Sequence, residues 1–470
     1  MALIDNLIIF IYLAALIGIG IYANHKQADV EDYYVAGRRQ GTVSIACLWL
    51  AGWIGGASII GSSGKAYEAG VTGVWYVLAL AIGCGLFGLI AAKRVKQLGD
   101  THQYLTFPDL IEHQFDSKTR MIVTVTTVAA YIAFSAGQLA AAGSIIRVML
   151  DWDFSSALML ATGVVVLYTA TGGYLAVAWT DWVQFVLLII GVLLVGLPIA
   201  IQQTGGFGEL TSQLPETYTD VGAWGWSAIL ALVISIILSF FTSMDCYTRT
   251  FAARSVKAAR NGALLAVVFM LPLAVAATWM GMTTAVLFPG IVDSNDALTT
   301  FVLELFPPGL KGLMLVGILA AIMSSADICI LTASANVTRD IYQRYYDPDI
   351  SQARMLRLGM ISSLVIGLLS AFLAWKMQDV LNILALAFTL NSAAVILPTL
   401  AAVYAWRVDA NTAFWSICLS FATILTWYLC ASLDLALVFQ LEPLWPGLVV
   451  AFVSFFGLAW RKRRTLALAT

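Results

Sequence analysis

The chain has 470 residues, of which 60% are hydrophobic and only 11% are charged, and its mean hydropathy is +0.88. A soluble domain of this length needs far more charge to cover its surface, so the composition excludes a soluble globular protein. The formal net charge of −2 argues against a nucleic-acid partner. We therefore expect an all-α polytopic protein of the inner or plasma membrane, surrounded by lipid.

Apolar runs of about 20 residues, the length that spans a bilayer, recur about thirteen times along the chain. No soluble domain remains between them, which predicts a single transmembrane domain over 1–470. The first run lacks a basic preceding segment and a following small-residue cleavage site, so we interpret it as a retained helix rather than a signal peptide. The predicted spans are 6–22, 43–63, 71–92, 121–149, 155–177, 181–201, 225–248, 262–288, 313–337, 358–376, 380–405, 413–432 and 445–460.

The basic residues indicate how these spans are oriented. Of the 25 Lys and Arg residues, all but four fall in alternate loops and at the C-terminal end. Those loops face the cytoplasm if the N-terminus lies outside and the C-terminus lies in the cytoplasm. Such an orientation requires an odd number of crossings, which agrees with thirteen spans. The four exceptions are Lys65, Arg147, Lys311 and Lys376.

Two spans contain residues that interrupt an apolar helix. The second, LWLAGWIGGASIIGSSG, holds five glycines, which suit either close helix packing or a broken helix whose unwound backbone lines a cavity. The seventh, SIILSFFTSMDCYTRTF, holds Ser243 and Asp245. Counting the spans predicts two inverted five-helix repeats, at about 43–201 and 225–405, each of which begins with an interrupted span. Matched interruptions of this kind indicate a transporter binding site near the middle of the membrane. The flanking helices are then 6–22, 413–432 and 445–460.

Ionisable residues within spans cost several kcal/mol unless they are paired, hydrated or bound to an ion, so Asp181, Asp245 and Asp327 are functional candidates. Beside Asp327, the ninth span carries Ser324 and Ser325. Their hydroxyls either bond back to their own helix or bind a cation. Carbonyls freed by a broken second span, together with these hydroxyls, would supply the oxygen ligands that Na⁺ prefers. One cation site between the second and ninth spans accounts for both features.

Several segments together resemble the sodium:solute symporter family. AAIMSSADICILTASANVTRDIY at 320–342 is similar to the family's signature segment, and YTATGGYLAVAWTDWVQ at 168–184 fits its T-x-x-G-G-x-x-A-V-x-x-T-D-x-x-Q pattern. TFPDLIEHQF at 106–115 and TRTFAARS at 248–255 occur in the family's order. Within the family, WIGGASIIG most resembles the W-V-G-G-G of the high-affinity choline transporters. The resemblance covers almost the whole chain and implies the leucine-transporter fold of two inverted five-helix repeats with flanking helices.

The resemblance also implies a sodium site. It falls on the backbone carbonyls of Ala51, Ile54 and Ala321 and on the hydroxyls of Ser324 and Ser325.

Some members of the family bind a second sodium through the aspartate of the T-D pair and through hydroxyls that follow the serine pair. In this chain the aspartate is Asp181, but the hydroxyl positions read Asp327 and Ile328. A second ion or proton site at Asp181 and Asp327 is therefore one expectation. The alternative for Asp181 is that it caps a helix beginning beside it.

The resemblance and the polar residues within spans also indicate solute contacts. Sugar-transporting members carry Glu-Gln where this chain has Ala57 and Ser58, which argues against a sugar as the solute. The second tryptophan expected by analogy with the choline transporters is replaced in this chain by Ser243. A carboxylate beside aromatic rings suits an ammonium group, so Asp245 favours an amine, a quaternary ammonium or an amino-acid-like solute. Alternatively, Asp245 pairs only with Arg249 at i+4, and Trp53 packs on a neighbouring helix. The expected solute contacts are Trp53, Ser58, Phe134, Gln138, Ser243 and Asp245.

We predict a Na⁺-coupled symporter that imports a small organic solute by alternating access, with a monomer as the functional unit and no enzymatic activity. Sodium bound between the second and ninth spans would favour the outward-open state. The alternatives are a proton-coupled carrier of an organic acid or amino acid, with Asp181 or Asp327 carrying the proton, and a solute-sensing homologue. A membrane enzyme is disfavoured because the three histidines lie in loops and no H-E-x-x-H motif occurs.

Overall fold

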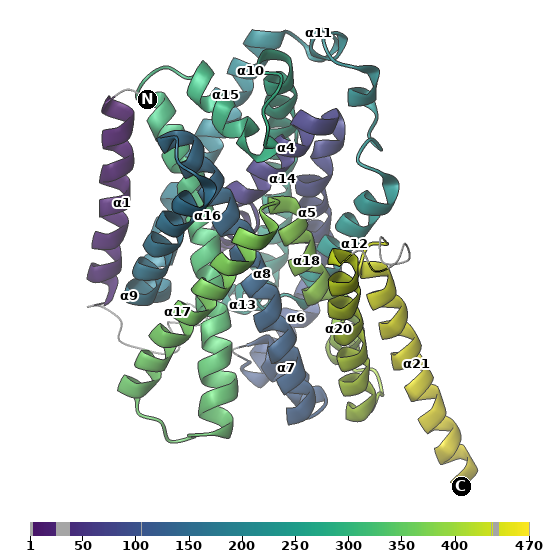
Figure 1. Cartoon of the computed structure of the whole chain (residues 1–470). Coiled ribbons are helices and arrows are strands. Elements are labelled where there is room, and N and C mark those ends of the chain that lie inside the picture. The colour runs from purple at the N-terminus through teal and green to yellow at the C-terminus, as the bar shows by residue number, and fades with distance from the viewer. Residues whose placement is uncertain (1–2, 25–37, 105, 434, 436–440, 470) are drawn as a thin grey trace.

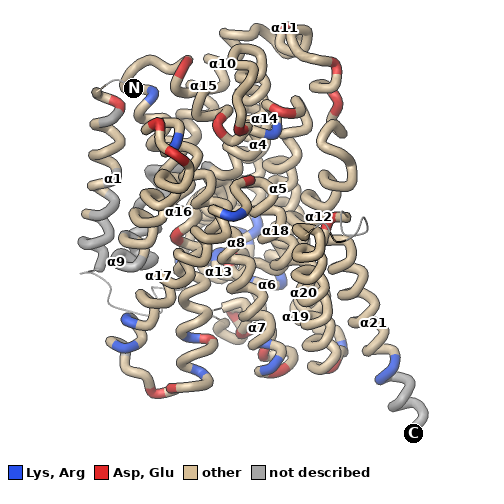
Figure 2. Tube along the Cα trace, viewed as in Figure 1, with Lys and Arg blue, Asp and Glu red and all other residues tan. Residues whose placement is uncertain are grey.

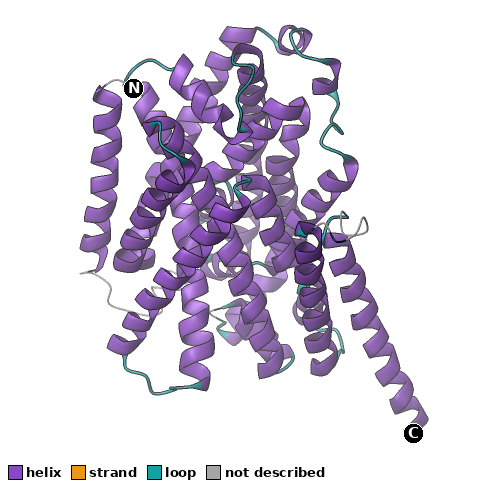
Figure 3. Ribbon diagram, viewed as in Figure 1, coloured by secondary structure: helices purple, strands orange, loops and turns teal. Residues whose placement is uncertain are grey.

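The computed structural model describes residues 3–24, 38–104, 106–433, 435 and 441–469. Those residues are almost entirely helical and form no strand (Figure 3), although Gln40 and Ala253 make an isolated bridge. Within the helices, the side chains of further residues lie outside the description, among them those of 19–24, 170–185 and 463–469. The α-helices are α1 Leu3–Asn24, α3 Thr42–Trp53, α4 Gly56–Ala69, α5 Trp75–Leu86, α6 Ala92–His102, α7 Phe107–Gln114, α8 Ser117–Leu150, α9 Phe154–Leu188, α10 Leu197–Thr204, α11 Phe207–Ser212, α12 Trp226–Thr242, α13 Met244–Ala252, α14 Val256–Leu287, α15 Ala297–Leu305, α16 Leu310–Ala335, α17 Gln352–Met377, α18 Val380–Ser392, α19 Ile396–Tyr404, α20 Ala410–Ser432 and α21 Leu444–Ala469.

The prediction of an all-α polytopic membrane protein is confirmed, and each predicted span coincides with helix. By length and composition, eight helical segments of the described residues can cross a membrane, or ten if each of two bent pairs counts as one span. Three shorter apolar helices add to these, at Leu3–Tyr12, Thr42–Trp53 and Phe154–Leu167. Charged residues gather toward the two ends of the molecule and leave its middle mostly uncharged (Figure 2). This distribution is expected of a protein whose middle faces hydrocarbon.

Two predicted spans, 155–177 and 181–201, lie in one helical stretch. It comprises α9, the π-helical segment η4 (Ile189–Gly196) and α10. The expected boundary between the two spans, near residues 178–180, falls among residues whose side chains lie outside the description.

The first helix is attached to the body of the protein at its N-terminal end. α1 packs against α9 and α16, and the buried carboxylate of Asp5 accepts hydrogen bonds from the backbone N–H groups of Gly309 and Gly312, each at 2.8 Å. These donors lie at the start of α16, where backbone N–H groups have no partner within the helix. The start of α1 and the end of α21 lie at opposite ends of the molecule (Figure 1), as an odd number of crossings requires.

α16 is the central helix of the structure. In its most apolar 18-residue window 83% of the residues are buried inside the protein, against 22% for the span at α21. It contacts α8, α9 and α17 along its length and also α3 and α4. The polar residues of the ninth span are therefore enclosed by protein and do not face lipid.

Two of the helical spans are interrupted where the sequence predicts it. α3 and α4 are separated at Ile54 and Gly55, and α12 meets α13 at Ser243 with a bend of 47°. The start of α3 lies beside the end of α13. There, the backbone N–H of Gln40, just before α3, donates to Ala252 O at 3.0 Å. A third bend of 46°, between α18 and α19, was not predicted.

Candidate functional site

The break between α3 and α4 exposes backbone oxygens to the interior of the protein. Ile54 has φ −103° and ψ 75°, and Gly55 has φ −82° and ψ 170°. Both conformations are non-helical, so the regular pattern of N–H(i) to O=C(i−4) bonds stops at this point. The carbonyls at the end of α3 are therefore available to other groups, as predicted for a broken span.

The serine pair of α16 lies directly against this break. Ser325 Oγ lies within hydrogen-bond distance of Ala51 O in α3, at 3.5 Å, and of Ala321 O in its own helix, at 3.1 Å. Ser324 Oγ donates to Ala321 O at 3.0 Å. The serines thus bond back to their own helix and also reach the broken one. Ile54 lies next to this group, and all five residues of the predicted sodium site are at least nine-tenths buried.

Gly55 allows the two elements to approach this closely. A Cβ atom at this position would lie 2.6 Å from Ser325 Oγ, which is closer than real Cβ contacts, and 3.2 Å from Ala321 O. It would also lie 3.2 Å from the side-chain oxygen of Gln138 in α8. A side chain at Gly55 would therefore displace the Ser325 hydroxyl or push α16 away from the break.

Gln138, which the sequence assigns to the solute, lies at the edge of this oxygen cluster. Its Oε1 atom is buried and has no hydrogen-bond partner among the described residues. A buried amide oxygen without a partner costs about 1–3 kcal/mol. This oxygen is available to a cation or to a donor group of a ligand.

The cluster formed by Ala51, Ile54, Ala321, Ser324 and Ser325 offers only neutral carbonyl and hydroxyl oxygens in a buried position. Hard cations prefer oxygen ligands over nitrogen or sulfur. In transporters with discontinuous helices, unwound backbone carbonyls are a typical source of Na⁺ ligands. The geometry and chemistry of the cluster fit a small monovalent cation.

The two aspartates proposed for a second ion are placed less favourably. Asp327 is fully buried, but it follows Ser325 by two residues on α16. At about 100° per residue, its side chain leaves the helix on a different face from that of Ser325. The side chain of Asp181 lies outside the described residues, while α9 continues through this position, so Asp181 does not stand at the start of a helix.

An aromatic group lies on another side of the break. Trp53, the last residue of α3, stacks on Phe240 of α12 with ring centroids 4.0 Å apart and on Phe388 of α18 at 6.0 Å. Phe134 of α8 meets Phe388 edge-on at 4.7 Å. The structure thus joins Trp53 and Phe134, both predicted solute contacts, through Phe388; the sequence singled out neither Phe388 nor Phe240. The alternative interpretation of Trp53, packing on neighbouring helices, describes the contacts observed.

Asp245 is engaged by two neighbours at the start of α13. It forms an ion pair with Arg249 one turn later, and Tyr131 of α8 donates a hydrogen bond to Asp245 Oδ1 at 3.0 Å. The guanidinium of Arg249 also lies 5.6 Å from the ring centre of Trp49 in α3. The i, i+4 pairing anticipated as an alternative is therefore present, and it links α13 to α8 and α3.

The two remaining predicted solute residues have local hydrogen bonds. Ser243, at the bend between α12 and α13, accepts a hydrogen bond at 2.5 Å from the side-chain amide of Asn391 in α18. The same amide donates to Thr242 Oγ1 at 3.2 Å. Ser58 donates to Trp53 O across the other break at 3.2 Å. Asn391 was missed, although a buried amide within an apolar span is the kind of signal that identified Asp245.

Comparisons with known proteins agree with this arrangement. Residues 33–419, well over half of the chain, match the model of the sodium:solute symporter family. The chain is similar to the high-affinity proline transporter PutP of Bacillus subtilis (strain 168), with 25% identity over 77% of this chain and 78% of the relative. It is also similar to the sodium/proline symporter of Escherichia coli (strain K12), with 26% identity over 89% and 86% of the two chains. Neither of these relatives is a choline carrier.

Solved structures show the same fold. A Na⁺-coupled sialic acid symporter in its substrate-bound outward-open state superposes with a TM-score of 0.76 at 20% identity, covering 97% of this chain and 96% of that one. The nucleobase-cation-symport-1 family transporter Mhp1 superposes with a TM-score of 0.58 at 17% identity, covering 92% and 96%. The architecture is thus that of leucine-transporter-fold proteins. The chain belongs to the sodium:solute symporter family, whose members are Na⁺-coupled transporters of small solutes in the membrane.

Proposed function

We propose that this protein binds one Na⁺ between the α3–α4 break and α16 and uses it to drive the import of a small organic solute. The ligands are the carbonyls of Ala51, Ile54 and Ala321 and the hydroxyls of Ser324 and Ser325. The observation that carries this assignment is the contact of Ser325 Oγ with Ala51 O, 274 positions apart in the sequence. Gly55 supports it, because a Cβ at this position would crowd the Ser325 hydroxyl where it stands against the broken helix.

We propose an amino-acid-like zwitterion as the solute. Asp245 already pairs with Arg249, so the local charge is balanced, and a simple cation would have to compete with Arg249 for the carboxylate. A solute with both an ammonium and a carboxylate can meet both members of the pair. The neighbouring rings of Trp53, Phe240, Phe388 and Phe134 would cover its apolar part. The proline transporters among the relatives carry a solute of this class, whereas choline is a cation without a carboxylate.

In the proposed cycle, the protein works as a monomer with its N-terminus outside and its C-terminus in the cytoplasm. The spans over 43–201 and 225–405 act as inverted repeats, which is supported by the matched interruptions at Gly55 and Ser243. Sodium stabilises the arrangement in which the break and the serine pair are in contact, and this arrangement has the higher affinity for solute. Moving one repeat against the other then opens the site to the opposite side.

Whether a second ion takes part is a separate proposal. Asp327 is buried two residues after Ser325 on α16, and Asp181 occupies the family's T-D position. In the proton-coupled alternative, one of these aspartates carries the proton. This alternative predicts uptake that depends on pH and continues when Na⁺ is replaced by K⁺.

The test is uptake of radiolabelled amino acids, amines and organic acids by the purified protein in proteoliposomes, with an inward Na⁺ or K⁺ gradient. We expect Na⁺-dependent uptake, and we expect Ser325→Ala to raise the Na⁺ concentration needed for half-maximal uptake. Ser334→Ala is the matched control, because Ser334 lies on the same helix and bonds to Gly359 O, away from the break. A Ser325→Ala variant with wild-type sodium dependence would overturn the site assignment.

A further inference from the structure

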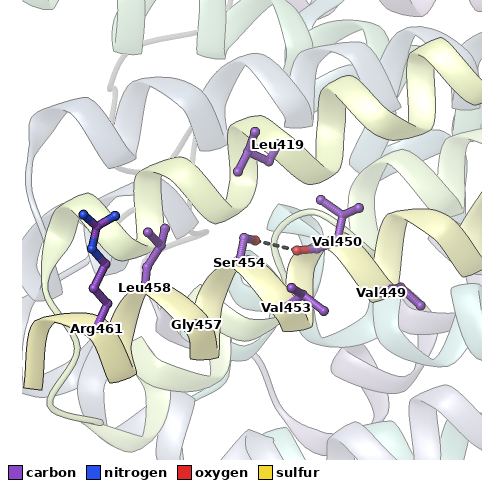
Figure 4. A pocket seen from close by; sticks show the side chains of 8 residues that line it. All are labelled: Leu419, Val449, Val450, Val453, Ser454, Gly457, Leu458 and Arg461. Carbon is purple, nitrogen blue, oxygen red and sulfur yellow. Dashed lines mark hydrogen bonds between the residues drawn. The ribbon is translucent and has the colours of Figure 1, made fainter. Parts of the chain in front are cut away.

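A groove runs between the last two helices, away from the proposed transport site. Its volume is about 510 Å³, and Figure 4 shows Leu419 of α20 on one side and side chains of α21 on the other. Two of the α21 residues, Val449 and Val453, are 61% and 68% exposed, so the groove lies on the outer surface of the protein. It is lined by Leu419, Val449, Val450, Val453, Ser454, Gly457, Leu458 and Arg461.

α20 and α21 are in close contact near the start of α21, and beyond that contact the space between them is open, although a lysine side chain still reaches across it near the other end. Near the start of α21, Ser420 Oγ donates to Gly447 O at 2.8 Å, and a Cβ at Gly447 would lie 2.5 Å from the side chain of Ile424. Ten residues later, a Cβ at Gly457 would meet nothing within 4 Å. α21 accordingly leans away from the body of the protein toward its C-terminal end (Figure 1).

The lining is apolar along its length and basic at one end. The one hydroxyl, on Ser454, donates to Val450 O of its own helix at 2.5 Å. At the open end stands Arg461, the first residue of the RKRR sequence at 461–464. The next residue, Lys462, pairs with Asp409 at 2.8 Å, which fixes this end of α21 beside the start of α20. Basic clusters directly beyond a membrane helix attract anionic lipid headgroups.

The length of the groove agrees with the depth of one lipid leaflet. From Val449 to Arg461 the helix rises about 18 Å at 1.5 Å per residue, and half of a hydrocarbon core of about 30 Å is about 15 Å. We propose that this groove is a binding site for an acidic phospholipid, with one acyl chain along α21 and the phosphate at Arg461.

A second copy of this chain is a poorer fit to the groove. Two copies related by a twofold axis along the membrane normal would bring two RKRR sequences to the same leaflet. Like charges brought together across an interface cost free energy. A single anionic headgroup instead neutralises the basic end.

The test measures lipid bound to the purified full chain in detergent by native mass spectrometry. Phosphatidylglycerol or phosphatidylcholine with identical acyl chains is added in parallel titrations. We expect the tightest site to prefer phosphatidylglycerol by about fivefold, the contribution of one basic side chain at the surface. Arg461→Gln should remove this preference, and because the residue is exposed the variant should keep the fold. Gly457→Leu should weaken the binding of both lipids by filling the groove.

Two variants serve as controls. Gly163→Leu places a leucine at an exposed glycine of α9 that also has nothing within 4 Å, and Arg357→Gln removes a charge from an exposed position elsewhere. Neither should alter lipid binding. Equal binding of the two lipids, or a preference that survives Arg461→Gln, would overturn the proposal. A dimer that Gly457→Leu converts to a monomer would overturn it in favour of a second copy.

Discussion

Substituting alanine for Gly55 changes the proposed sodium site by a single methyl group. The new Cβ would lie 2.6 Å from Ser325 Oγ, whereas ordinary contact begins at 3.4 Å. Because Oγ ends a rotatable side chain, either the Ser325 hydroxyl turns away from the break or the break and α16 separate, since packed interiors leave little room to absorb an added methyl group. Either change moves the Ser325 hydroxyl away from the carbonyl of Ala51, which is the contact that defines the site.

The free-energy cost of the Gly55→Ala substitution follows from the tight packing around this position. Forcing an extra carbon into a well-packed interior costs about 1–3 kcal/mol, and this free energy corresponds to about 5–150-fold in affinity. The penalty is expected on sodium affinity because bound Na⁺ requires the two elements to stay together. We therefore expect Gly55→Ala to need at least fivefold more Na⁺ than the wild type for the same effect.

Thermal stability measured against Na⁺ concentration is the assay, because it needs no knowledge of the solute. Sodium that binds only the folded protein stabilises it by RT ln(1 + [Na⁺]/Kd), so a weaker site shifts the rise in melting temperature to higher Na⁺ concentrations. Gly163→Ala is the matched control, since a Cβ there would meet nothing within 4 Å. An unchanged sodium response in Gly55→Ala would contradict the placement of the ion between these two helices.

The structure supports three further predictions. Asp5→Ala should lower the free energy of unfolding by about 0.5–2 kcal/mol, as the loss of a helix cap does. The reason is that the Asp5 carboxylate accepts hydrogen bonds from two backbone N–H groups at the start of α16. A thermal melt without ligand measures this change. Asp245→Asn should weaken the binding of zwitterionic and cationic solutes more than that of neutral ones in competition assays, and equal losses would indicate a purely structural role. Partial burial raises the pKa of Glu112, but hydrogen bonds from neighbouring side chains and the charges of Arg120 and Arg344 outweigh it and hold that pKa below 4.5. The stabilisation of the fold by the ionised Glu112 is then complete above pH 4.5 and is lost as the pH falls below it. Glu112→Gln should therefore reduce the loss of folding stability on the acid side of a plot of stability against pH.

The sequence predicted the interrupted spans because their causes are local. Clustered glycines and a polar residue within an apolar run are visible without knowing any neighbour. That Ser325 lies against the broken helix could also be expected from the sequence. The hydroxyls of the serine pair and the carbonyls freed by the break are two unusual features that complement each other, and one cation site explains both. The pairing of Asp245 with Arg249 could be anticipated as an alternative because residues four apart in a helix share a face.

The aromatic group around Trp53 could not be predicted in the same way. Phe240 and Phe388 belong to apolar spans in which lipid-facing and buried phenylalanines look alike. Which of them stacks on Trp53 depends on how α12 and α18 pack against α3, and packing between helices leaves little trace in a single sequence. The bend after Asn391 was missed for a related reason, because no glycine cluster marks it.

The break between α3 and α4 is where the ion and the solute would act on each other. The residues on one side of it, Ala51 and Gly55, face α16, while Trp53 faces the phenylalanines of α12 and α18. A cation that fixes the first side would also fix the orientation of Trp53, because only one residue separates Trp53 from Ala51 on one side and from Gly55 on the other. In the proposed mechanism the coupling needs no long pathway, since both ligands select the same conformation of one short segment. By linkage, the factor by which sodium raises the affinity for solute must then equal the factor by which solute raises the affinity for sodium.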